Sequence, residues 1–96
     1  MINRDEYLQK VKNHIDQWNQ DLKQLEAKAE AAQADAAAEY RKQLEYLREM
    51  RDDAAKRHAQ MQEAAGDAWK EVVHSIDKTW DAWVDAFGQM RDKLKG

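Results

Sequence analysis

The sequence predicts an all-α protein, built as a long amphipathic helix followed by a shorter C-terminal helix in one domain spanning residues 1–96. Three observations predict this class. The chain has no proline and only three glycines among its 96 residues, so few positions interrupt a helix. Ala, Glu, Lys, Leu and Arg dominate its composition, which is typical of long helices and coiled coils. No window alternates β-branched or aromatic residues with polar ones, as a strand would.

The first helix is expected over about residues 3–64. Asn3 followed by Glu6 fits a capping box at its start. Apolar residues then recur at alternating spacings of three and four, which is the pattern of a heptad seam. This seam, the predicted interface, consists of Leu8, Val11, Ile15, Trp18, Leu22, Leu25, Ala29, Ala32 and Ala36. After Ala36 the stripe shifts to an eleven-residue spacing through Leu47 and His58, which predicts a straighter supercoil.

A turn is predicted at residues 65–67, with a second helix over about residues 67–95. Gly66 suits the position just past a helix end and Asp67 is a good N-cap. The alternative is that Gly66 only bends one continuous helix. The second helix is strongly amphipathic, and its apolar stripe has the width of a core-facing surface. The predicted packing face, or possible lipid face, of this helix contains Trp69, Val72, Ile76, Trp80, Trp83 and Phe87.

Self-association is expected because a first helix of this length cannot cover its own stripe. A hairpin at Gly66 would leave the seam from Leu8 to Ala32 exposed, and isolated amphipathic helices are marginally stable in water. The small residues Ala29, Ala32 and Ala36 would let two copies of the helix cross closely. An antiparallel homodimer crossing there would pair residues 8–25 of one chain with residues 44–61 of the other. A parallel dimer is the rival arrangement.

Composition and motifs argue against several functional classes. The net charge of −3 is spread along the chain, so no nucleic-acid partner is expected. With no cysteine, there is no disulfide or thiolate metal site. Glu71 and His74 have the spacing of a di-iron motif but form a single copy on the polar face, so no metal is predicted. Ser75 and Thr79 lie within a helix without a nucleophile elbow. We therefore expect neither cofactor nor enzymatic activity.

Location follows from similar arguments. The longest apolar runs, such as Ala36–Ala38, have only three residues, far too few to span a bilayer, and the N-terminal residues lack the apolar region of a signal peptide. A cytoplasmic protein is expected, with peripheral membrane contact as an alternative because tryptophans favour the interface of a bilayer. A further alternative is an adaptor whose exposed apolar stripe receives a helix of another protein.

The sequence also resembles a family of small bacterial proteins of about a hundred residues described as coiled-coil or stress-response proteins. The likeness covers nearly the whole chain. It rests on the N-terminal segment MINRDEYLQKVKNHIDQWNQDLKQLEAKA, on AAGDAWKEV, and on KTWDAW. The resemblance implies a stress-related role and no catalytic residues. Together, these observations predict a non-enzymatic, self-associating coiled-coil protein with a structural, scaffolding or stress-protective role in the bacterial cytoplasm.

Overall fold

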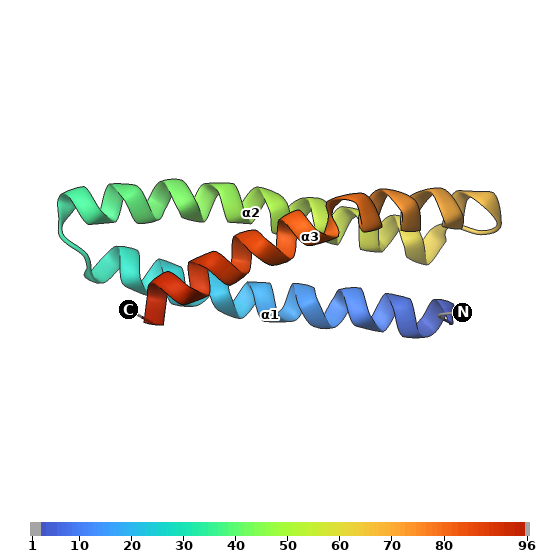
Figure 1. Cartoon of the computed structure of the whole chain (residues 1–96), viewed down its shortest axis with the longest axis horizontal. Helices are drawn as coiled ribbons and strands as arrows, with labels where there is room; N and C mark the ends of the chain where they lie inside the picture. The colour runs from blue at the N-terminus through green and yellow to red at the C-terminus, as the bar shows by residue number, and fades with distance from the viewer. Residues whose placement is uncertain (1–2, 96) are drawn as a thin grey trace.

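Three α-helices pack into an elongated bundle with extents of 51 × 19 × 18 Å. The computed structural model describes residues 3–95, with side chains described as far as residue 93. The helices are α1 (Arg4–Ala31), α2 (Ala34–Glu63) and α3 (Asp67–Lys95). α1 and α2 form an antiparallel hairpin, and α3 returns along it in the direction of α1 (Figure 1). The all-α class is confirmed, and the described part of the chain contains no strand.

α1 begins where the sequence predicts, and its first turn is capped. The Asn3 side chain accepts a hydrogen bond from the Asp5 amide at 3.0 Å, one residue earlier than the capping box predicts. Asp5 and Glu6 lie in the first turn of α1 and Lys28 lies in the last turn. Both placements favour the helix because negative charge stabilises its N-terminus and positive charge its C-terminus.

The prediction of one continuous helix over residues 3–64 is wrong. The helix is broken at Ala32 and Gln33, which take extended conformations with φ of −84° and −73°. The physical reason is burial. A single helix over residues 4–63 would be about 90 Å long and would leave its seam in water. Folding the chain at this point lets α2 cover the seam of α1 within the same molecule.

The second turn lies where the sequence places it. Gly66 has φ of +58°, a left-handed conformation that glycine adopts without a steric penalty. α3 then begins at Asp67. The hydrophobic core runs along the axis shared by the three helices. It contains Tyr7, Val11, Ile15, Trp18, Leu22, Leu25, Leu44, Leu47, Ala54, Met61, Ile76, Trp83, Phe87 and Met90.

Replacing glycine by alanine should change the stability of the protein in opposite directions at Gly66 and at Gly88. Gly66→Ala should lower the free energy of unfolding by about 1 kcal/mol, because a Cβ is disfavoured at this positive φ. Gly88 lies inside α3 with open space around an added Cβ. Gly88→Ala should therefore raise stability by about 0.5–1 kcal/mol through its higher helix propensity. Urea unfolding of both variants measures this, and equal effects would contradict the conformation assigned to Gly66.

Candidate functional site

The predicted interface residues of the first helix are mostly buried inside the chain itself. Val11, Ile15, Trp18, Leu22, Leu25 and Ala29 are buried, and Leu8 packs against the core while remaining partly exposed. Ala32 is half-buried in the turn and Ala36 is exposed on α2. The seam therefore serves as an intramolecular interface as far as Ala29, and its last two positions contribute little to it.

The pairing expected between two chains is found within one chain. His58 Nε2 lies 3.1 Å from the Leu8 carbonyl oxygen, and Arg51 donates to the Asn19 side chain at 2.7 Å. Arg4 donates to the carbonyl oxygens of residues 61 and 62, each at 2.9 Å. Residues 8–25 thus lie along residues 44–61, as predicted, but in the same molecule. The expectation that a second copy is required to cover this seam is wrong, because the break at Ala32 lets α2 cover it.

A second row of residues on α1 faces α3, and sequence reasoning missed it. Tyr7, His14 and Asp21 are spaced seven residues apart, one step around the helix from the seam. Each contacts α3: Tyr7 contacts Asp77, His14 contacts Trp80, and Asp21 contacts Arg91. The heptad spacing was visible in the sequence. Two of the three residues are polar, so the row does not form the apolar stripe from which helix packing is predicted.

An aromatic cluster joins the two rows at the centre of the bundle. Trp18 is completely buried, and its ring stacks on Phe87 with centroids 4.9 Å apart. Trp80 and Trp83 lie around the same ring at 5.8 and 6.1 Å. Such aromatic pairs stabilise beyond the area they bury, by about 0.5–1.5 kcal/mol each. The predicted packing face of the second helix is therefore turned toward α1.

The tryptophans of α3 are also contacted by cations from the other two helices. The Arg4 guanidinium lies 4.9 Å from the Trp69 ring centroid. The Lys10 ammonium lies 5.4 Å from Trp80, and the Arg57 guanidinium lies 5.5 Å from Trp83. A cation over an indole ring is attracted by the ring quadrupole. These contacts cover the partly exposed rings Trp69 and Trp80 at the edges of the bundle. Val72 is likewise half-buried, and Ile76 is fully buried.

One carboxylate is buried in this interface. Asp21 is 1% exposed, and its Oδ2 lies 3.1 Å from Arg91 Nε. The N–H of Arg91 does not point at that oxygen, so charge rather than an aligned hydrogen bond holds this pair. Gln17 donates to the other carboxylate oxygen at 3.1 Å. A buried charge is costly without such partners, so Asp21 strongly constrains where the end of α3 packs.

The fold changes the acidity of the Tyr7 hydroxyl. Its ring is buried between α1 and α3, and its hydroxyl donates to Asp77 at 2.8 Å. Burial, followed by the hydrogen bond to Asp77 and the negative charge of Asp77, raises the pKa of Tyr7 well above its ordinary value. The neutral hydroxyl is thereby kept as a donor in alkaline solution, above the ordinary tyrosine pKa of about 10.

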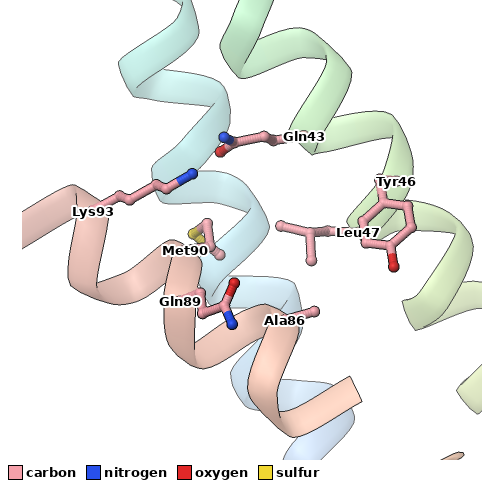
Figure 2. Close-up of a pocket in the computed structure, with 7 residues that line it drawn as sticks. All are labelled: Gln43, Tyr46, Leu47, Ala86, Gln89, Met90 and Lys93. Atoms are coloured by element: carbon pink, nitrogen blue, oxygen red, sulfur yellow. The ribbon is translucent and has the colours of Figure 1, made fainter. Parts of the chain in front are cut away.

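A shallow groove of about 190 Å³ lies between α2 and α3 on the surface. Leu47 of α2 and Met90 of α3 point toward one another across it, with Gln43 and Lys93 near one end (Figure 2). Tyr46 stands at its rim and is 58% exposed. Leu47 and Met90 are each only 3% exposed, so Tyr46 is the large apolar side chain that this groove presents to solvent.

Among residues 3–95, no three His, Asp or Glu side chains gather as a metal site would require. No helix in this range is both long and apolar enough to cross a bilayer. Comparison of the chain with family models, with curated proteins and with solved structures finds no match.

The aromatic cluster yields a stability prediction. Trp18→Ala should lower the free energy of unfolding by about 3–5 kcal/mol, because it removes the largest fully buried side chain and leaves a cavity. Tyr46→Ala, at an exposed position of α2, is the matched aromatic control and should change stability by no more than about 0.5 kcal/mol. Denaturant unfolding followed by circular dichroism measures both. Equal losses would mean that the cluster is not the centre of the core.

Tyr7 yields a pH prediction. Because its pKa is raised in the folded state, it contributes stability below the ordinary tyrosine pKa of about 10, and this is lost as pH rises toward the folded value. In alkaline solution the free energy of unfolding should therefore fall less steeply for Tyr7→Phe than for the parent chain. A tyrosinate absorbance titration provides the check. The difference between the two proteins should be one tyrosine that ionises above the ordinary range.

Proposed function

We propose that this chain is a non-enzymatic helical protein that associates with a second copy of itself. Its role would be structural, scaffolding or stress-protective in the bacterial cytoplasm, in line with the family it resembles. The functional surface in this proposal is the α1 seam together with the alanines that extend it, and the favoured assembly is a dimer. No catalytic, cofactor or metal residues are assigned.

One observation carries the self-association. The heptad phase of α1 continues through Ala29, Ala32 and Ala36, although the helix itself ends at Ala31. In the hairpin Ala29 is buried, Ala32 is half-buried and Ala36 is exposed, so beyond Ala29 this continuation contributes little packing within the single chain. In a continuous helix the same residues would lie on the buried side of an interface, and their small size would allow two backbones to approach closely.

The contacts of the titratable residues support a structural role over chemistry. Asp21 is paired with Arg91, and Tyr7 is hydrogen-bonded to Asp77. His58 lies against a backbone carbonyl of α1. Each of these groups is occupied by a partner from another helix and so contributes to packing and register.

Lipid binding is the second candidate, and the packing of α3 weighs against it. Phe87, Trp83 and Ile76 face the core, and cations cover the rings of Trp69 and Trp80. To reach a membrane, α3 would have to leave all these contacts. Its polar side is mixed in charge, whereas helices that lie on membranes usually carry Lys and Arg there.

The proposal predicts a mass that depends on concentration. Light scattering coupled to size exclusion should show the monomer at low concentration and twice that mass at high concentration. A monomer at every concentration would contradict the proposal.

Tryptophan fluorescence with anionic vesicles tests the lipid alternative. A blue shift with protection from quenchers would favour lipid binding, and an unchanged spectrum would favour the packed bundle. A monomer that captures an added amphipathic helix on the Tyr46 groove would favour the adaptor.

A further inference from the structure

We infer that the turn at Ala32–Gln33 is a hinge, and that the dimer forms by exchange of α1 between two copies. In the exchanged form residues 4–63 of each chain would be one helix, and α1 of one copy would lie on α2 and α3 of the other. This inference rests on the proposed self-association and specifies its geometry. The partner is a second copy of this chain, because only a second copy carries the same complementary surfaces.

The two turns of the molecule differ in how strongly their residues specify a turn. The turn before α3 has Gly66 in a left-handed conformation that a helix interior does not contain. The turn between α1 and α2 has neither glycine nor a positive φ, and the Gln33 side chain makes no capping hydrogen bond. Its residues, Ala31-Ala32-Gln33-Ala34, are all good helix formers. The intrinsic helix propensity of the residues therefore favours a continuous helix through the turn between α1 and α2, but not through the turn before α3.

Straightening this turn would also supply backbone hydrogen bonds. The last carbonyls of α1 and the first amides of α2 are helix-end groups without intrahelical partners. The Ala37 amide donates to the Gln33 carbonyl at 2.8 Å, but this is the first bond of α2 and does not cross the turn. In a continuous helix each of these groups would gain an intrahelical partner. The opposing cost is the entropy of bringing two chains together, so concentration decides which form prevails.

The pairing register of the hairpin suits the exchanged dimer. When two copies of one helix pack antiparallel, a two-fold axis relates them. For each pair of facing residues, the average of the two residue numbers gives the position at which this axis crosses the helix. In the hairpin, Leu8 pairs with His58 and Glu26 with Arg48, which places these averages at positions 33 and 37. Because the turn takes up only two residues, a continuous helix keeps nearly the same register. The crossing would then fall on the alanines at 32, 36 and 37.

The end of the bundle leaves room for this crossing. α3 stops short of the turn, so that α1 and α2 extend beyond its C-terminus as a two-helix segment (Figure 1). Ala34 and Ala36 are exposed there. In the exchanged dimer the aromatic cluster would be shared, with Trp18 supplied by one copy and Trp83 and Phe87 by the other. Each copy would therefore complete the core of its partner.

A cysteine-free chain allows the exchange to be tested by cross-linking between two single-cysteine variants. Glu26 and Arg48 form an ion pair between α1 and α2 and are each 44% exposed, so their replacement should cost little stability. Glu26→Cys and Arg48→Cys proteins are mixed at high concentration and treated with a short bis-maleimide. In an exchanged dimer the two cysteines face one another across two chains. In a dimer of intact hairpins each faces its own chain.

Ala34→Pro is the variant that separates the two forms. Ala34 is the first residue of α2, where proline is favoured, and Gln33 already has an extended conformation compatible with a following proline. In a continuous helix a proline costs about 3 kcal/mol, so the dimer association constant should fall by more than about a hundredfold. Ala38→Gly is the matched control, because residue 38 is helical in both forms and the change weakens both alike.

The expected result is an intermolecular 26–48 cross-link that Ala34→Pro abolishes and Ala38→Gly preserves. A mixture of Glu26→Cys and Lys12→Cys should give no such product, because exchange does not bring these positions together. A dimer by light scattering without the 26–48 cross-link, or one that Ala34→Pro leaves intact, would overturn the exchange while self-association stands. A chain that is monomeric at every concentration overturns both proposals.

Discussion

The burial of α1 is the constraint on which the other features of this molecule depend. α1 carries two rows of residues that must leave water, the seam along Leu8, Ile15 and Leu22 and the row of Tyr7, His14 and Asp21. No single neighbouring helix can cover both rows. α2 covers the first and α3 the second, and this demand gives the chain two turns, an antiparallel hairpin and a third helix parallel to α1 (Figure 1). Trp18 lies in the seam, and its ring also contacts His14 of the second row and Phe87 of α3, which explains why this large side chain is completely buried.

Polar groups set the register of α3 on this hairpin. Apolar contacts alone allow a helix to slide by a turn at modest cost, whereas a buried donor or charge must meet its partner. Tyr7 with Asp77 and Asp21 with Arg91 lie two heptads apart along α1. The stacked rings of Trp18 and Phe87 lie between them. A displacement of α3 by one turn would break both polar pairs together, so we infer that these pairs select one packing among several similar apolar ones.

The two turns of the molecule differ in how strongly their own residues specify a turn. Gly66 commits the chain to a turn before α3, while Ala32 and Gln33 turn only because the helices beyond them pack together. A turn held by tertiary contacts can be replaced by any arrangement that supplies the same contacts, and in the proposed exchange a second copy would supply them. The proposed structural role follows from this property, because a protein that exchanges helices can link copies without needing a surface beyond its own core. Such an assembly would respond to concentration, which is a simple way for a scaffold to form when the protein accumulates.

The sequence by itself determined the helical class, the seam from Val11 to Leu25 and the helix that starts at Asp67, because these depend on local propensity and on the spacing of apolar residues. The sequence also predicted the turn at Gly66, because a left-handed residue just past a helix end is usually glycine. Only the tertiary structure decided the break at Ala32–Gln33, the choice of α2 of the same chain as the cover for the seam, and the burial of Tyr7 and Asp21. The physical reason is the same in each case. Alanine and glutamine favour the helix locally. The helix breaks because burial of α1 against residues some thirty to fifty positions away stabilises the folded chain more than continuing the helix would. A local sequence pattern does not contain this comparison of free energies.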